Sequence, residues 1–253
     1  MIKTGVLALV MMSVVATSSQ ADETAAREIL ANMAEYLAEQ EVLSFDFDSS
    51  LEIITPENQK LAIASSGSIA MERPGKIHVT RRGGFASVQA VFDGRKLSVA
   101  NLVANVYAQL ELTGSIDPAV DRLRADYGHP LPGADLLSPN VAKILLDDVT
   151  DVKDLGSGVI RGEECDHLAF RAPEVDWQIW VSQSDTPYPC RYVITTKTMA
   201  SSPQYTLDIS SWGAGSALND FTFTAAEGAT RVDAADIPDL DEIAGIYVPE
   251  GGN

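Results

Sequence analysis

The sequence has few of the residues on which catalytic and metal sites most often depend. Of its 253 residues only three are histidines and two are cysteines, and 18 basic residues are outnumbered by 36 acidic ones. The resulting net charge of −18 disfavours binding to nucleic acid and to anionic membrane surfaces. No G-x-S-x-G, H-E-x-x-H, P-loop or G-x-G-x-x-G motif is present. The sequence therefore predicts no enzyme, no metal site and no cofactor, although a triad assembled from distant residues carries no such motif.

Long apolar runs are also missing beyond the first residues. Residues 1–21 have the pattern of a secretory signal, in which Lys3 precedes an apolar stretch at 6–16 and cleavage is expected after Ala21. That stretch is too short to span a membrane comfortably, and no later segment approaches a spanning length. We therefore expect an exported protein that does not span the membrane, with residues 22–253 forming one soluble domain.

The two cysteines, Cys165 and Cys190, allow two interpretations. An even number of cysteines in an oxidising compartment usually pairs, so a disulfide between them is the favoured one. The alternative is a metal site at Cys165-Asp166-His167, which lacks further ligands at a fitting spacing. A bridge that closes a loop of this size stabilises the fold by about 3 kcal/mol in the chain-entropy model.

The sequence is rich in long strand patterns with one apolar face. From residue 43 to residue 53 apolar side chains occupy most odd positions and polar ones the even positions, which is the period of a half-buried strand. Short turn signals such as Asp93-Gly94 predict antiparallel neighbours. Strands are expected at about 42–54, 60–72, 76–82, 85–92, 96–100, 104–110, 149–154, 158–163, 165–172, 175–182, 189–197, 204–212 and 219–223. A single sheet of this size with few helices tends to curl around space.

Helical patterns occur in two places. Residues 22–40 bring Ile29, Met33 and Leu37 to one face, which predicts an N-terminal helix lying on the sheet. Residues 115–147 predict three short helices inserted between the two sets of strands. This insertion is either a fixed cover that completes the core or a movable lid over an open sheet. The tail, from about residue 225 to residue 253, is acidic and weakly periodic.

The apolar strand faces supply the candidate ligand-binding residues. One interpretation is that these side chains form a cavity with aromatic walls. The other is that they form an ordinary core, and alternation alone does not distinguish the two. The candidates are Phe45, Phe47, Leu51, Ile69, Met71, Ile77, Val79, Trp177 and Ile179.

Three motifs, in order along the chain, carry a resemblance to a known family. They are M-E-R-P-G-K at 71–76, V-F-D-G-R-K-L at 91–97, and F-T-F-T-A-A-E-G-A-T-R-V-D at 221–233. The chain resembles the LolA-like superfamily of periplasmic lipoprotein carriers, and its middle part looks like a functionally unassigned branch of exported proteins within it. Where the family's closing segment has Pro-Pro, this sequence has Ala225-Ala226.

The resemblance implies a fold, a place and one functional residue. The implied fold is α+β and mainly antiparallel β: a curved, half-open β-barrel with an N-terminal helix, a helical lid and an apolar cavity for acyl chains. The implied location is the periplasm. The arginine of the Arg-Pro turn links the body to the lid in the carriers and gates opening, and Arg73 occupies that position here.

Three functional hypotheses follow. The first is a periplasmic binding or carrier protein that holds a hydrophobic or acylated ligand, a lipid or a lipoprotein, chiefly by burying apolar surface. The second is a structural, interaction or sensor module whose core is filled and which binds no small molecule. The third is a hydrolase with an unrecognised site, which requires a nucleophile within reach of a base in a polar cleft. A cavity in the sheet would favour the first hypothesis, and a filled interior would favour the second.

Overall fold

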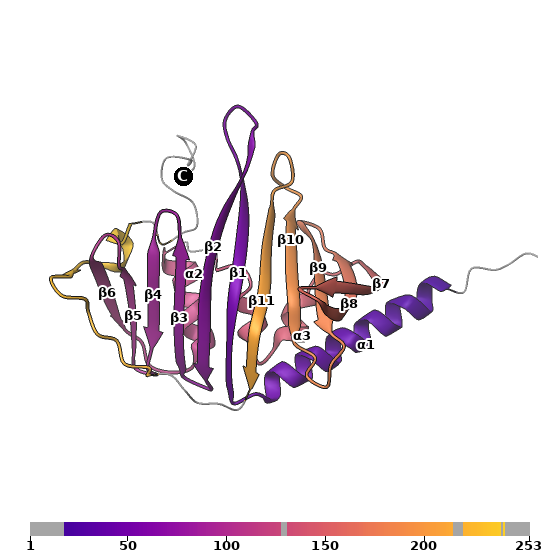
Figure 1. Ribbon diagram of the computed structural model, residues 1–253, viewed down its shortest axis with the longest axis horizontal. Coiled ribbons are helices and arrows are strands. Elements are labelled where there is room, and N and C mark those ends of the chain that lie inside the picture. Colours follow the sequence, from indigo (N-terminus) through magenta and orange to yellow (C-terminus); the bar gives the residue numbers. More distant parts are fainter. Residues whose placement is uncertain (1–17, 128–130, 215–219, 239, 241–253) are drawn as a thin grey trace, which may run out of the picture.

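The computed structural model describes residues 18–127, 131–214, 220–238 and 240, and these form one 12-stranded sheet with helices on one face (Figure 1). The strand order is β12-β6-β5-β4-β3-β2-β1-β11-β10-β9-β8-β7. Two antiparallel meanders, β1 to β6 and β7 to β11, are therefore joined where β1 pairs with β11. The strands are β1 (Val42–Ile54), β2 (Lys60–Glu72), β3 (Lys76–Gly83), β4 (Ser87–Phe92), β5 (Lys96–Asn101), β6 (Val106–Glu111), β7 (Asp151–Ile160), β8 (Glu163–Arg171), β9 (Val175–Ser182), β10 (Pro189–Thr196), β11 (Gln204–Ala214) and β12 (Thr230–Arg231).

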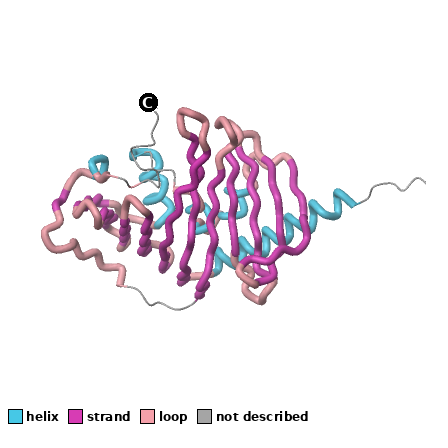
Figure 2. Tube along the Cα trace, turned by 45° about the horizontal axis from the view of Figure 1, so that its top comes forward, coloured by secondary structure: helices cyan, strands magenta, loops and turns pink. Residues whose placement is uncertain are grey.

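The helices gather on one face of this sheet, which we call the inner face (Figure 2). They are α1 (Ser18–Glu39), α2 (Ile116–Tyr127), η1 (Ala134–Leu137) and α3 (Val141–Leu145), with the short η2 (Ala234–Asp236) near the C-terminus. In α1 the buried side chains recur every three or four residues, as an amphipathic helix requires: Ala26, Leu30, Met33 and Leu37. The predicted fold class is confirmed: one curved, mostly antiparallel sheet carries an N-terminal helix and a helical insertion.

The register of the first meander produces three rows of side chains across the inner face. The first row is Leu43, Met71, Ile77, Phe92, Leu97 and Leu110, and the second is Phe45, Ile69, Val79, Ala90, Val99 and Ala108. The third is Phe47, Gly67, Arg81, Val88, Asn101 and Val106. The first two rows are wholly apolar and must be covered. Only the third contains polar side chains.

Two of the expected strand assignments are wrong. The tracts at 149–154 and 158–163 are one strand, β7, because a shift in register between Asp154 and Ser157 accommodates the extra residues. Gly156, with φ of 81°, supplies the left-handed conformation that such a bulge uses. Residues 220–223 form no strand. Their alternating aromatic residues instead contact side chains: Phe221 lies under Lys76 and Phe223 lies against Tyr107.

The expected leader, residues 1–21, lies mostly outside the described residues, so cleavage near Ala21 stays a prediction. The helix α1 begins at Ser18, four residues before the expected start. Among the described residues no helix is long and apolar enough to cross a membrane.

Candidate ligand site

All nine candidate wall residues lie in or against one core on the inner face. Six of them are at most 9% exposed: Phe45, Phe47, Met71, Ile77, Trp177 and Ile179. The other three, Leu51, Ile69 and Val79, are half-buried and pack against the same core. A void large enough for an acyl chain would leave open surface on the side chains around it. In this structure the inner face is therefore closed at the six buried residues, and the role of all nine as ligand contacts stays a prediction.

Aromatic stacking fills much of the space under the second meander. Trp177 on β9 stacks on Phe170 of β8, with ring centroids 3.8 Å apart and planes inclined by 7°. The edge of Tyr192 meets the same indole at 5.9 Å. On β1, Phe45 stacks on Trp212 at 5.5 Å. These rings contact one another directly.

Arg73 lies where the sheet meets the two helical segments. Its Nε donates to the carbonyl oxygen of Gln40 at 3.1 Å, and one terminal nitrogen donates to that of Leu37 at 3.4 Å. These carbonyls belong to the C-terminal end of α1, where a cation is favoured. The next residue, Pro74, accepts a hydrogen bond from the backbone N–H of Ile116, the first residue of α2, at 2.9 Å. We call these bonds the Arg73 joint, since they connect one turn of the sheet to both helices.

Charge adds a second contact between the Arg73 joint and α2. Burial lowers the pKa of Arg73, and the nearby carboxylate of Asp117 opposes that change. Burial likewise raises the pKa of Asp117, while Arg73 and a hydrogen bond from Ser138 oppose it. Motif matching identified Arg73, but it could not identify Asp117, because only the docking of α2 brings the two together.

A cleft of about 420 Å³ lies within the helical cover, between α2, η1 and α3. None of the nine predicted wall residues lines it. Its walls mix apolar side chains with charged ones, including an ion pair between Arg124 and Asp135 at 2.9 Å. The apolar wall residues are Ile116, Val120, Ala134, Leu137 and Ile144. Open space in the helical cover, away from the sheet, was not foreseen from the sequence, because it depends on how three short helices pack.

Cys165 and Cys190 meet in a second, smaller core with Ile160. Their sulfur atoms lie 2.6 Å apart, which is longer than a disulfide bond of about 2.05 Å, so the disulfide stays a prediction. Burial raises the pKa of both thiols. Close by, Tyr188 donates a hydrogen bond to Glu163, at 2.5 Å.

The structure gives little support to the metal alternative at residues 165–167. Asp166 points to the opposite face from Cys165 and His167, and the ring of His167 is occupied by stacking on Trp180 at 3.9 Å. Within the described ranges, no three His, Cys, Asp or Glu side chains gather to hold a metal ion.

We expect protein recovered from an oxidising compartment to contain the Cys165–Cys190 disulfide. Intact-mass measurement before and after reduction should differ by the mass of two hydrogens. The Cys165→Ser/Cys190→Ser variant should lose about 3 kcal/mol of unfolding free energy, because the bridge closes a loop between residues 25 positions apart. The matched control is the wild type in reductant, which should be destabilised to a similar extent. Free thiols on both cysteines in the exported protein would contradict the prediction.

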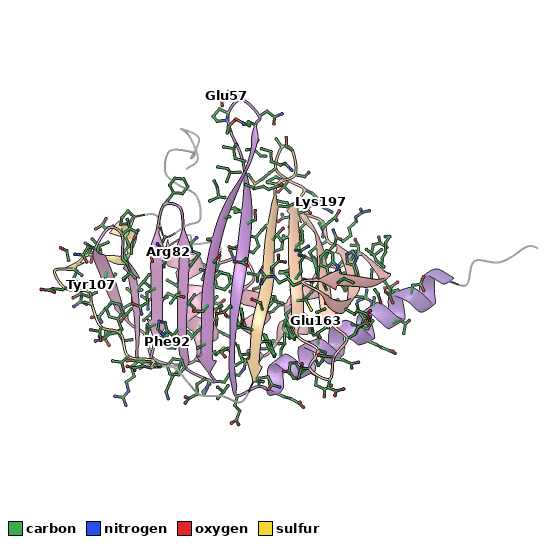
Figure 3. The ribbon with its side chains drawn as sticks, viewed as in Figure 1. Glu57, Arg82, Phe92, Tyr107, Glu163 and Lys197 are labelled. Atoms are coloured by element: carbon green, nitrogen blue, oxygen red, sulfur yellow. The ribbon has the colours of Figure 1, made fainter. Side chains whose placement is uncertain are left out.

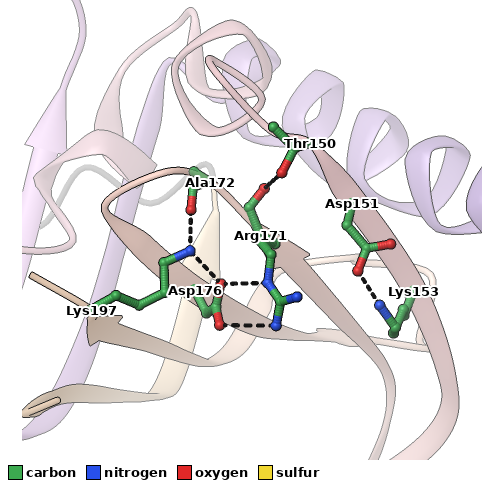
Figure 4. Close-up of polar contacts among 7 residues, drawn as sticks. All are labelled: Thr150, Asp151, Lys153, Arg171, Ala172, Asp176 and Lys197. Atoms are coloured by element: carbon green, nitrogen blue, oxygen red, sulfur yellow. Dashed lines mark hydrogen bonds and ion pairs between the residues drawn. The ribbon is translucent and has the colours of Figure 1, made fainter. Parts of the chain in front are cut away.

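A polar cluster on the β8–β9 hairpin is explained by structural contacts (Figure 4). Asp176 accepts hydrogen bonds from Arg171 and pairs with Lys197, each at 3.1 Å. Burial alone would raise the pKa of Asp176, but the bonds from these two cations lower it overall. Lys197 also donates to the carbonyl oxygen of Ala172. Both cations contact the same carboxylate, which is typical of a contact that holds a hairpin in place.

The chain matches one protein family and is similar to several solved structures. A family model described as predicted periplasmic protein (DUF2092) matches residues 26–235, whereas no curated protein matches the chain. Among solved structures it is similar to the Mycobacterium tuberculosis lipoprotein LppX, at 13% identity and a TM-score of 0.40, covering 78% of this chain and 100% of that one. It is also similar to LprF from Mycobacterium bovis, at 10% identity and a TM-score of 0.49, covering 79% of this chain and 98% of that one. A third similar structure is a LolA superfamily protein from Nitrosomonas europaea, at 15% identity and a TM-score of 0.34, covering 76% of this chain and 94% of that one.

Proposed function

The chain belongs to the family of predicted periplasmic proteins (DUF2092), and we propose that it acts in the periplasm as a binding or carrier protein for a hydrophobic or acylated ligand. Its leader is cleaved near Ala21 on export. The ligand, a lipid or the acyl chains of a lipoprotein, lies against the inner face of the sheet. The structure then represents the closed form, in which the protein's own helices occupy the space that the ligand takes.

The observation that supports this proposal is the breadth of the apolar inner face together with the Arg73 joint. Two complete rows of that face are apolar across six strands, and burying such surface contributes about 25 cal/mol per Å². When an acyl chain replaces a helix on this surface, the surface stays buried, so the stabilisation from its burial is kept. Opening requires the bonds from Arg73 to the end of α1 to break. Hydrogen bonds that involve a charged group contribute about 1.5–3 kcal/mol each, which is small enough to be exchanged for ligand contacts.

A kinetic experiment tests the proposal in the mature full-length protein. Native mass spectra of protein from its own host are recorded first, and uptake of a fluorescent fatty acid is then followed by stopped flow. Arg73→Met keeps the aliphatic stem but removes the two side-chain hydrogen bonds from Arg73 to the end of α1. We expect it to speed uptake by at least about 10-fold, because the loss of even one such bond, about 1.5 kcal/mol, favours the open form by that factor.

The matched control is Arg82→Met, which changes an exposed arginine on β3 outside the joint (Figure 3). Its uptake rate should equal that of the wild type. The proposal fails if no amphiphile accompanies the purified protein and neither the wild type nor Arg73→Met takes up the probe.

One observation favours a second candidate, an interaction or sensor module. The aromatic and aliphatic side chains of the inner face are packed directly against one another, as in an ordinary core. Such a module would bind no fatty acid in any variant, and it would retain a protein partner through its exposed surface. The uptake experiment therefore separates the two candidates.

A further inference from the structure

The described part of the C-terminal tail returns to the inner face, at the end of the sheet formed by β3 to β6. We call the described residues 230–238 and 240 the tail segment. It begins as β12, which pairs in parallel with the edge strand β6. The N–H of Thr230 donates to the carbonyl oxygen of Asn105 at 3.0 Å, and that of Val232 donates to Tyr107 at 2.9 Å. Beyond η2 the segment leaves this edge and enters the main core.

Several apolar side chains of the tail segment pack against the inner face. Ile237 is 6% exposed and belongs to the core that contains the sheet's apolar rows. Leu240 packs against that core. The surrounding tail is otherwise largely exposed, from residue 224 to residue 236. Val232 and Ala234 of the segment also pack against this core while half-buried, so Ile237 is the segment's one buried apolar insert among the described residues.

The two polar side chains of the third row hold the backbone of the tail segment. Asn101, 1% exposed, donates from Nδ2 to the carbonyl oxygen of Pro238 at 2.9 Å. Arg81 donates to the carbonyl oxygen of Leu240 at 2.6 Å. The register places both donors in the same row of the inner face. A buried donor is costly unless it meets an acceptor, so any group that occupies the surface at Asn101 must bring an oxygen atom with it.

Given the carrier function proposed above, we propose that the tail segment is a tethered, displaceable occupant of the ligand site. The ligand binds at the β3–β6 end of the inner face, with its apolar chain where Ile237 and Leu240 lie. Its carboxylate or ester oxygens accept the hydrogen bonds that Arg81 and Asn101 now donate to the tail segment. The ligand class is therefore a fatty acid or an acyl ester.

Displacement is physically reasonable because few contacts hold the segment. The strand β12 has two residues, whereas the register of β1 with β2 covers 13 pairs. A carboxylate also forms a stronger, charge-assisted bond to a guanidinium than a neutral carbonyl does. An anionic acyl ligand thus replaces the hydrogen bond from Arg81 to the tail with a stronger one.

Palmitate is the test probe, used with the full-length mature protein. Ile237→Ser weakens the apolar packing of the tail segment. Ala235→Ser is the control, because it introduces serine at an exposed position of the same segment. We expect Ile237→Ser to bind palmitate with a Kd lower on the order of 10-fold, because loss of a buried aliphatic side chain favours the displaced tail. Ala235→Ser should match the wild type. Hydrogen exchange at the amides of Thr230 and Val232 should accelerate in the wild type when palmitate is added.

The outcomes separate this inference from the proposed function. Equal palmitate affinity in wild type and Ile237→Ser, with the tail amides still protected in the complex, overturns the inference and leaves the carrier function standing. Absence of binding by both proteins overturns both. Binding by Ile237→Ser alone supports the inference, since the wild-type tail then blocks the site fully. Leu240→Ser provides a second variant with the same expected direction, and a thermal melt of each variant verifies that it is folded.

Discussion

Gly67→Ala is expected to destabilise the folded protein by about 3 kcal/mol or more, at the upper end for overpacking. Gly67 lies in the middle of β2, opposite Phe47 of β1 and Arg81 of β3. A Cβ atom there would lie 2.0 Å from the backbone oxygen of Thr80 and 2.6 Å from Cζ of Phe47. The ring can rotate away, but the oxygen belongs to β3 and cannot move without shifting that strand. Urea unfolding monitored by tryptophan fluorescence measures the loss.

The control for this prediction is a glycine in the neighbouring hairpin. A Cβ atom at Gly84 has no atom within 4 Å, so Gly84→Ala should change the unfolding free energy by less than about 0.5 kcal/mol. The double variant Phe47→Leu/Gly67→Ala should remain unstable, because the contact with Thr80 persists. Full rescue by Phe47→Leu would show that the aromatic ring, and not the β3 backbone, sets the requirement for glycine.

The strands around Gly67 show what alternation predicts well. The expected ranges 42–54 and 60–72 coincide with β1 and β2, because period-two patterning follows directly from strand geometry. The same rule placed all nine candidate wall residues on one face. Alternation reports which face a side chain points to, but it carries no information about what covers that face. It therefore could not predict that helices and tail fill the inner face.

The parts missed from the sequence depend on contacts between distant segments. Arg81 and Asn101 lie in strands predicted correctly, yet their role arises only when a tail more than 130 residues away from Asn101 along the sequence returns to the sheet. Asp117 acquires its altered pKa only when α2 docks beside Arg73. The tail itself has too little periodicity to indicate that Ile237 is buried. Local patterns determine elements and faces, whereas these sites require the tertiary arrangement.

Trp177→Ala is the second large effect, with an expected loss of about 3–5 kcal/mol in unfolding free energy, the range for truncating a packed aromatic residue. The indole is 4% exposed and stacks on Phe170 at 3.8 Å. Its removal leaves a cavity that the rigid neighbouring strands cannot close. The control is Trp180→Ala in the same strand, whose side chain points to the opposite face and is half-buried against His167. The unfolding free energy of that variant should fall by less, about 1–2 kcal/mol.

The size of the Trp177 effect also tests whether the inner face is filled. If the ring borders unoccupied space, truncation removes few contacts and the loss should fall to the value for Trp180→Ala. A loss of 3–5 kcal/mol identifies a packed core, so that a ligand can enter only by displacing the helices or the tail segment. In that case Trp177→Ala should take up the fluorescent fatty acid without Arg73→Met, because the new cavity supplies apolar space that the closed form lacks. A large loss of stability without any gain in uptake would favour the interaction module over the carrier.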